Sequence, residues 1–475
     1  MKPAAQSSSK WLRRRPARML AALALPWFAA CSLVPQHQRP DVTVPAQWAT
    51  GTTAQAEVPA TQWWRAYDSA ELDRLIQTAL AANRDLAASL SRIEQARASL
   101  RSARSALLPS AGLSASASHD RRRADGVTTT SEDGQAAVSV AYELDLWGAN
   151  RAATTAADAD LAAARYSHES VALVLQADVA TAYFQYLALS DRLRIARDNL
   201  DAARELMRLV QVRYDNGAAT ALEIAQQRAT LLGIEAQVPS LVQSLRETRH
   251  ALAVLLGQPP ASLALQAGTL AGLALPAVDP GQPAQLLVRR PDVRIAEARL
   301  IAAEADIGAA RAALLPGVDV SASAAATGLI GGGSATLASL AASLAQTIFS
   351  GGRLQAQLAY SKAVREELVA SYAQTVLTGL QEVEDSLSLL ETSRSRTALL
   401  AQTAEAARET YRLARVQYDA GAVDLLTVLD SQRSRLSSED TLVQAQLAQL
   451  NATAQLVKAL GGGWAAPVPA PAPRG

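Results

Sequence analysis

The amino-acid sequence contains the same plan twice. Arg-Tyr-Asp-Asn-Gly-Ala at 213–218 recurs as Gln-Tyr-Asp-Ala-Gly-Ala at 417–422, and Ala-Leu-Leu-Pro at 106–109 recurs at 313–316. The spacing is similar for both pairs and indicates a tandem duplication of about 200 residues. Whatever one copy folds into, the other is expected to fold into as well.

Each copy begins with a helix and continues with a β-hairpin. Apolar residues at helical spacing run from 71 to 108 and from 291 to 315, and a proline ends each run. Strict alternation follows, most clearly at 138–146, and predicts strands with one apolar and one polar face. We expect hairpins at 111–147 and 317–349, the first turning through 121–134 and the second through 331–333.

A long helical hairpin is predicted after each β-hairpin. More than sixty residues without proline, at about 1.5 Å per residue, give on the order of 100 Å of helix. Two sets of apolar residues have coiled-coil spacing: Tyr186, Leu193, Leu200, Met207 and Tyr214 in the first copy, and Leu368, Tyr372, Val376, Leu380, Val383, Leu387 and Leu390 in the second. Gly217 and Gly421 end these helices, and shorter helices return to Gly257 and Gly461. Pro239 predicts a kink in the first return helix.

The amino terminus is typical of an export signal. Basic residues at 2–18 precede an apolar stretch at 19–30, which predicts a signal peptide over 1–30. Small residues stand directly before Cys31, the one cysteine of the chain, and resemble a lipoprotein cleavage site. We expect Cys31 to be lipidated and to begin an extended segment over 31–67; a buried thiol after an ordinary signal peptide is the alternative.

Composition excludes several classes of function. Lys and Arg total 45 against 44 Asp and Glu, and no long basic run follows residue 18, so phosphate neutralisation on nucleic acid is not expected. Four scattered histidines and the single cysteine match no metal-ligand spacing, and no nucleophile elbow or phosphate loop is present. We therefore expect no catalytic residues, no metal, no cofactor and no enzymatic activity.

The strands have the length of membrane-spanning strands. Four of them cannot close a transmembrane barrel, and an open sheet edge is not tolerated in lipid, so other copies of the chain must complete the barrel. Trp147 and Phe349 occupy equivalent places in the two copies and suit the aromatic belt at a membrane interface. A soluble hairpin packed on helices is the alternative.

Three motifs make a family resemblance specific. They are Ala-Tyr-Glu-Leu-Asp-Leu-Trp-Gly at 141–148, Arg-Arg-Pro-Asp-Val at 289–293 with Ile-Gly-x-Ala-Arg at 307–311, and Leu-Val-Lys-Ala-Leu-Gly-Gly-Gly-Trp at 456–464. Together they resemble the OprM/NodT branch of TolC-like outer-membrane efflux proteins. Taken alone, Pro291-Asp292 is only a helix start and Arg311 only a solvated helix residue.

The resemblance implies an α+β membrane protein that works as a homotrimer. Three chains of four strands would form a 12-stranded barrel in the outer membrane, continued by an α-helical barrel across the periplasm. The first repeat would span 68–262 and the second 291–464, with an equatorial linker at 263–290 and a disordered tail at 465–475.

The function that the resemblance implies is a passive exit duct for drugs or other toxic small molecules. A periplasmic adaptor and an inner-membrane transporter of the RND type would be its partners, together with outer-membrane lipid. An outlet for type I protein secretion or for heavy metals is the alternative within the same fold. A trimeric coiled-coil surface fibre is the alternative from another class, although it would carry one terminal anchor rather than a hairpin in each copy.

Two groups of residues are candidate functional sites. The turns Gly217-Ala218-Ala219 and Gly421-Ala422-Val423 are predicted as periplasmic tips that contact the adaptor. Leu426 and Asp430 lie four residues apart, share a helix face and match gate positions in the resembled family. Their counterparts in the first copy are Leu222 and Gln226, so the acid occurs once. The alternative places Leu426 in a coiled-coil core and Asp430 on a solvated surface.

Overall fold

A computed structural model describes residues 33–49, 62–266, 268–328, 330 and 333–462. The signal peptide, Cys31 and the tail at 465–475 lie outside the described residues. The chain divides into two compact units, one built on Ala96–Leu161, Arg299–Leu368 and the residues up to Gln38, the other on Arg39–Gln95, Ala162–Ala298 and the residues from Val369.

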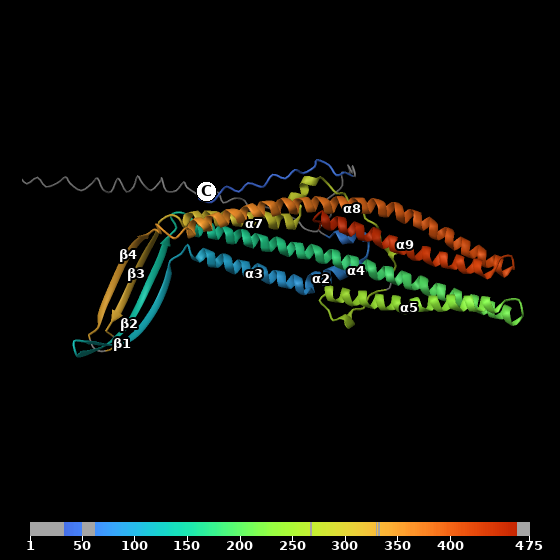
Figure 1. Cartoon of the computed structure of the whole chain (residues 1–475), viewed down its shortest axis with the longest axis horizontal. Helices are drawn as coiled ribbons and strands as arrows, with labels where there is room; N and C mark the ends of the chain where they lie inside the picture. Colours follow the sequence, from blue (N-terminus) through green and yellow to red (C-terminus); the bar gives the residue numbers. More distant parts are fainter. Residues whose placement is uncertain (1–32, 50–61, 267, 329, 331–332, 463–475) are drawn as a thin grey trace, which may run out of the picture. The chain divides into compact units, whose positions relative to one another are not determined.

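The first unit contains an antiparallel sheet of four strands. The strands are β1 (Ser110–Ala124), β2 (Val127–Leu144), β3 (Gly317–Thr327) and β4 (Ala335–Ala345), adjacent in the order β1-β2-β3-β4 (Figure 1). Each copy of the repeat contributes one hairpin, and β2 pairs with β3 to join them. The strands β1 and β4 are therefore left at the two edges.

The turn of the first hairpin is tighter than the sequence predicted. Residues 121–134 were expected to form the turn, but the strands continue through them and reverse at Asp125 and Gly126, which both have positive φ (52° and 80°). An Asp-Gly pair with this geometry makes a two-residue turn whose twist suits the flanking strands. The charged residues of this segment therefore lie on strands.

The sheet has one apolar and one polar face. Cross-strand partners share a face, and one face carries the neighbours Leu113, Val138, Ala324 and Ala338, in that order across the four strands. The opposite face carries the neighbours Gly112, Ser139, Ser323 and Ser339, and the hydroxyl of Ser339 lies 2.7 Å from that of Ser323. The apolar face is solvent-exposed in the single chain, where Leu113 and Leu340 are both 79% accessible.

Three shorter helices precede the hairpins: α2 (Ala70–Ala82), α3 (Arg84–Ser105) and α7 (Pro291–Ala312). The sequence predicted a single helix at 71–108, whereas the structure breaks it at Asn83. The Asn83 side chain accepts a hydrogen bond from the amide of Leu86 (2.9 Å) and donates one to the carbonyl of Leu255 (2.9 Å). An asparagine that caps a new helix competes with continuation of the old one.

Four longer helices form two hairpins. The first is α4 (Ala149–Asp215) with α5 (Ala221–Leu255), and the second is α8 (Arg353–Asp419) with α9 (Leu425–Ala459) (Figure 1). α5 runs continuously through Pro239. Gln227 donates to the carbonyl of Ala203 (2.7 Å) between α4 and α5, and Arg408 donates to Glu439 (2.7 Å) between α8 and α9.

The predicted coiled-coil seams are right in the second copy and only partly right in the first. Five of the seven residues predicted in the second copy are buried: Tyr372, Val376, Val383, Leu387 and Leu390. In the first copy Leu193 and Leu200 are buried, but Tyr214 is 44% exposed and the core is continued by Leu206 and Val210. A helix of 3.6 residues per turn drifts relative to a strict repeat of seven, so the buried stripe moves off the predicted positions.

The core of the second unit surrounds short irregular elements. These are η2 (Trp63–Tyr67), η3 (Pro260–Ser262), η4 (Leu270–Gly272), η5 (Pro283–Gln285) and α6 (Leu286–Arg289). The ring of Tyr67 lies 4.9 Å from that of Phe184 in this core, and burial raises the pKa of the Tyr67 hydroxyl. Trp48 donates its indole N–H to the carbonyl of Gly281 (2.8 Å) and ties the N-terminal segment to the linker at 263–290.

The Arg-Arg-Pro-Asp motif has a structural role that the sequence did not indicate. The buried Arg290 donates to Asp292, to Glu382 on α8 and to the carbonyl of Ala459 at the end of α9, each at 2.7 Å. Burial lowers the pKa of Arg290, but the two carboxylates outweigh burial and the net shift is upward. Arg311 is also more than a solvated residue, because its guanidinium donates to the carbonyl of Leu33 (2.8 Å).

Candidate functional site

Both helical tips are built in the same way. Gly217 has a φ of 72° and donates to the carbonyl of Tyr214, while Ala218 donates to that of Arg213. In the second copy, Gly421 (φ 74°) and Ala422 make the equivalent bonds. This double bond is the Schellman ending, which satisfies the last free carbonyls of a helix and favours glycine in the left-handed conformation. The duplicated sequence therefore produces two equivalent turns.

The helices that return from the tips are capped immediately. Thr220 and Glu223 form a reciprocal capping box at the start of α5. Asp424 accepts from the amide (2.9 Å) and the hydroxyl (2.7 Å) of Thr427 at the start of α9, and these bonds lower the pKa of the Asp424 carboxyl. Each connection is therefore five residues long, 216–220 and 420–424, between two ordered helix ends.

The predicted tip residues are mostly exposed. The glycines Gly217 and Gly421 and the alanines Ala218 and Ala422 are exposed, whereas Ala219 and Val423 are half-buried. Val423 packs against a small apolar cluster that includes Leu206, Val210, Tyr418, Leu425 and Val428. The cluster holds the ends of α4, α8 and α9 together beneath the turns and leaves small side chains at the outer surface.

Arg213 links the two tips and was missed by the sequence analysis. Its guanidinium lies 4.4 Å from the ring centre of Tyr418 and donates to the carbonyls of Tyr418 (3.0 Å) and Asp419 (3.4 Å). The last carbonyls of a helix carry partial negative charge, so a cation is favourable there. One signal was available in the sequence: the position equivalent to Arg213 in the second copy is the uncharged Gln417.

Leu426 and Asp430 both lie on an exposed face of α9. Leu426 is 52% accessible, and the adjacent core positions are taken by Leu425, Val428 and Leu429. Within the single chain, Leu426 therefore lies outside the apolar core that these residues form. Asp430 forms an exposed ion pair with Arg433 (3.3 Å), a neighbour that the sequence analysis did not single out.

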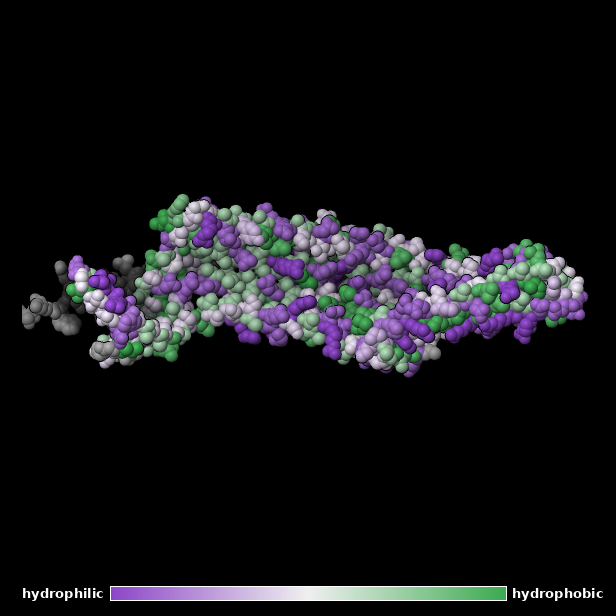
Figure 2. All heavy atoms as spheres, turned by 60° about the horizontal axis from the view of Figure 1, so that its bottom comes forward, coloured by the Kyte–Doolittle hydropathy of each residue, from purple (hydrophilic) through white to green (hydrophobic). Residues whose placement is uncertain are grey.

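The counterparts of this pair in the first copy differ in chemistry. Leu222 is 65% accessible on α5, and Gln226 is half-buried. Both leucines therefore project from the surface near a tip, but only the second copy adds a carboxylate. Figure 2 shows hydrophobic residues lying beside hydrophilic ones on the helical hairpins, on the face drawn.

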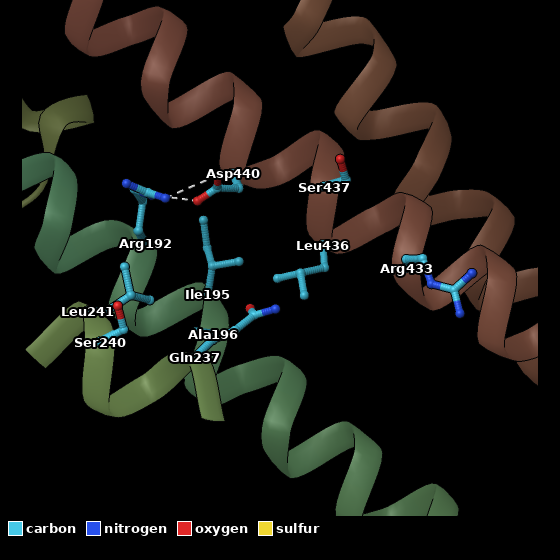
Figure 3. A pocket seen from close by; sticks show the side chains of 10 residues that line it. All are labelled: Arg192, Ile195, Ala196, Gln237, Ser240, Leu241, Arg433, Leu436, Ser437 and Asp440. Atoms are coloured by element: carbon cyan, nitrogen blue, oxygen red, sulfur yellow. Dashed lines mark hydrogen bonds and ion pairs between the residues drawn. The ribbon is translucent and has the colours of Figure 1, made fainter. Parts of the chain in front are cut away.

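A groove lies farther from the tips, between α4 and α5 on one side and α9 on the other. Its volume is about 410 Å³, and Arg192 crosses it to reach Asp440, with 2.5 Å between Nε and Oδ1 (Figure 3). Arg435 makes a second link from α9, stacking on Tyr411 at 4.5 Å and donating to the buried Asn199 on α4 (2.6 Å). Polar links of this kind can exchange with water when helices separate, unlike a continuous apolar contact.

The two predicted interface aromatics differ in their surroundings. Trp147 is half-buried and donates its indole N–H to the carbonyl of Pro316 (2.7 Å), whereas Phe349 is 87% accessible. Cys31 lies outside the described residues. Within the ranges that the structure describes, no three His, Cys, Asp or Glu side chains are grouped so that they could hold a metal ion.

Comparison with known proteins identifies the family. The model of the family described as outer membrane efflux protein matches residues 75–258 and 283–462. The pyoverdine export outer membrane protein OpmQ of Pseudomonas putida is 38% identical over 458 residues, which cover 93% of this chain and 96% of that protein. The toluene efflux pump outer membrane protein TtgF of the same species is 33% identical, with 92% and 95% covered.

Solved structures confirm the fold class. The outer-membrane channel OprN is 32% identical with a TM-score of 0.82, covering 91% of this chain and 100% of that one. The open state of the MtrE outer membrane channel of Neisseria gonorrhoeae is 27% identical with a TM-score of 0.82, and 91% and 98% are covered. The expected TolC-like architecture is thus confirmed, and the chain belongs to the outer membrane efflux protein family.

Proposed function

We propose that three copies of this chain form the outer-membrane exit duct of a tripartite efflux pump for small molecules. One observation carries the proposal: the four-stranded sheet has an apolar face, a polar face and two unpaired edges, β1 and β4. Unpaired backbone groups are costly in lipid, and only a closed barrel removes both edges. Pairing β4 of one copy with β1 of the next closes twelve strands, with the serine-bearing face toward the lumen.

The small-molecule cargo is supported by the relatives. Those named for toluene, solvent and antibiotic efflux are 33% to 34% identical to this chain. Two relatives named for pyoverdine export reach 38% over more than nine tenths of the chain. Export of pyoverdine is therefore the second candidate function, and the two differ only in cargo.

The decisive experiment measures conduction and export separately. The purified full-length protein should give single-channel currents in a planar bilayer, and cross-linking should show that it is a trimer. Expression of the protein should restore solvent and antibiotic resistance to a host that lacks its own duct. If the protein forms channels and restores pyoverdine export but not resistance, the second candidate function is the right one. Absence of channels would overturn the proposal.

The tips are proposed to contact the periplasmic adaptor, which links the duct to an inner-membrane transporter of the RND type. Ala218 and Ala422 are exposed and small, so an approaching helix can come close to the backbone. Glutamate at either position should abolish resistance while leaving trimers intact. Glutamate at Ala401, an exposed alanine of α8 that lies 20 residues before Gly421, is the matched control. Normal adaptor cross-linking in the tip variants would contradict the proposal.

Leu426 and Asp430 are proposed to narrow the periplasmic mouth. Threefold symmetry would gather three exposed leucines and three carboxylates, which are devices that close and select in narrow pores. Asp430→Ala should remove channel block by multivalent cations added from the periplasmic side, and Leu426→Ser should raise resting conductance. Gln226→Ala, at the equivalent place in the first copy, is the control. Wild-type block and conductance in both gate variants would locate the constriction elsewhere.

Cys31 is proposed to carry the lipid anchor of the mature protein. A single acyl anchor binds membranes only marginally, so the barrel would still hold the protein in place. Mass spectrometry of the mature chain should find acylated Cys31, and Cys31→Ser should impair sorting but not conduction. An unmodified Cys31 at the mature N-terminus would contradict this assignment.

A further inference from the structure

The hairpin of β1 and β2 extends beyond the rest of the sheet. The last pair between β2 and β3 joins Gln135 to Thr327, whereas β1 and β2 remain paired as far as Ala124 and Val127. Residues 117–124 and 127–134 therefore form a two-stranded ribbon, which we call the outer ribbon. The outer ribbon lies at the turn end of the hairpin, away from the end where the chain enters β1 from α3 and leaves β2 for α4.

Charges on the outer ribbon are sorted by face. On the face that continues the apolar side of the sheet, the successive cross-strand pairs are Ala117 with Gly134, His119 with Glu132, Arg121 with Thr130, and Arg123 with Thr128. On the face that continues the polar side, they are Ser118 with Asp133, Asp120 with Ser131, and Arg122 with Thr129. The lipid-facing side thus gains two arginines, and its single acid is Glu132.

That acid is already engaged. Glu132 lies 3.2 Å from the Nδ1 atom of His119. Arg121 and Arg123 are exposed, face threonine hydroxyls across the ribbon, and form no ion pair with any of the residues that the structure describes. Two guanidinium groups and two hydroxyls therefore point away from the lumen without an acidic partner.

These arginines lie on the headgroup side of the apolar band that the strand length predicts. From Leu144 to Gly134 the strand β2 covers ten residues, which is about 33 Å at 3.3 Å per residue. At a strand tilt of about 40° this length corresponds to the roughly 25 Å apolar band of an outer-membrane barrel. Arg121 and Arg123 pair with Thr130 and Thr128, four and six residues beyond Gly134, which is about 13 and 20 Å farther along the strand. From there their long side chains can extend back toward polar headgroups.

We propose that Arg121 and Arg123, with Thr128 and Thr130, form a binding site for the phosphate groups of an outer-leaflet glycolipid. The proposal rests on the proposed function, since the barrel decides which face of the ribbon meets lipid. Guanidinium groups bind phosphate oxygens through two parallel hydrogen bonds, and neighbouring hydroxyls can donate further ones. Bound lipid would pack around the barrel at its outer rim.

Arg122 supplies a matched control, because it lies between the two arginines in sequence but on the opposite face. The full-length protein and the variants Arg121→Gln, Arg123→Gln and Arg122→Gln are reconstituted in phosphatidylcholine vesicles that contain diphosphorylated lipid A. Native mass spectrometry then counts the glycolipid that stays bound. Arg121→Gln and Arg123→Gln should each lower retention about fivefold, as expected for one basic residue at an anionic membrane surface, whereas Arg122→Gln should retain the wild-type amount.

Three outcomes would overturn the site. These are equal losses in Arg122→Gln and Arg121→Gln, equal retention of lipid A from which the phosphates have been removed, and full displacement by inorganic phosphate, which would indicate a soluble anion instead. Single-channel conductance of the same preparations separates this test from the proposed function. Conducting channels without face-specific lipid retention would contradict the site alone, whereas absence of conductance would contradict the duct.

Discussion

Arg213 joins the ends of two helices that are far apart in the sequence. It contributes a cation over the Tyr418 ring and two hydrogen bonds to carbonyls at the end of α8. The repeat explains why the sequence did not reveal this contact. A pattern common to both copies identifies Tyr418 and Gly421, whereas Arg213 is marked only by its difference from Gln417, which does not indicate the residue that it contacts.

Replacing Arg213 by the glutamine found in the second copy should loosen the tips. Arg213→Gln loses the cation–π contact and a charge-assisted hydrogen bond, together about 1 kcal/mol for a partly exposed site. Thermal denaturation should show a lower midpoint, with faster amide exchange at 206–218. Arg412→Gln is the control, since among the described residues Arg412 pairs only with the exposed Glu409. An equal effect of the two substitutions would contradict the role of Arg213.

Asp424 should make the start of α9 sensitive to acid. Its pKa in the folded protein lies below the ordinary value of 3.8. The cap therefore stabilises the helix fully above that value, and its contribution is lost as pH falls through the lower folded pKa. Amide protection at 425–428, corrected for intrinsic rates, should stay constant down to about pH 3.8 and fall as the pH is lowered further. Asp424→Asn caps without ionising, so its protection should change little; a parallel fall in this variant would exclude Asp424 as the cause.

At the scale of the helices and strands, the glycines at helix ends serve two different purposes. At Gly217 and Gly421 a methyl group would meet nothing within 4 Å, so these positions need glycine only for their positive φ. At Gly257 a methyl carbon would lie 2.2 Å from the carbonyl oxygen of Ala82, next to the break between α2 and α3. The first kind of glycine shapes a turn, and the second allows two chain segments to touch.

Alanine substitution should separate these purposes. Gly217→Ala and Gly421→Ala should cost about 1 kcal/mol each, the penalty of a left-handed residue. Gly257→Ala should cost several times more, because it adds a backbone clash to the same strain. Chemical denaturation of the three variants provides the comparison. Similar midpoints for Gly217→Ala and Gly257→Ala would mean that the packing at Ala82 yields easily.

Elements were predicted from the sequence where one period dominates. The alternation at 138–146 predicted a strand, and the long proline-free stretches predicted helices. The duplication then predicted the same elements in the other copy. The predictions failed where a local contact decides the structure. Asn83 ends α2 because its side chain donates a hydrogen bond to a carbonyl that is distant in the sequence. The turn of the first β-hairpin consists of Asp125 and Gly126 alone, whereas composition predicted a turn over 121–134. The gate pair could be placed on a helix, but its exposure depends on the neighbouring helices.

At the scale of the whole molecule, the two faces of the sheet should differ in whether they tolerate a charged residue. Leu340 stands on the apolar face and Ser339, its neighbour in β4, on the polar face. An arginine in the middle of a lipid-facing surface costs about 2–4 kcal/mol, whereas a lumen tolerates charge. Leu340→Arg should therefore reduce the yield of membrane-inserted trimers, and Ser339→Arg should insert normally but shift ion selectivity. Equal insertion of both variants in heat-modifiability gels would contradict the assignment of the faces.

The long helices have the same length in both copies: 67 residues in α4 and α8, and 35 in α5 and α9. Each residue advances a helix by about 1.5 Å and turns it by about 100°. A one-residue insertion in a single copy would thus put that tip out of step with the other and rotate its outer residues to a different face. Lengthening is compatible with the fold only in steps of about seven or eleven residues, made in all four helices together. Each copy therefore limits how the other can change its length, so the reach of the helices can evolve only by rare, coordinated steps.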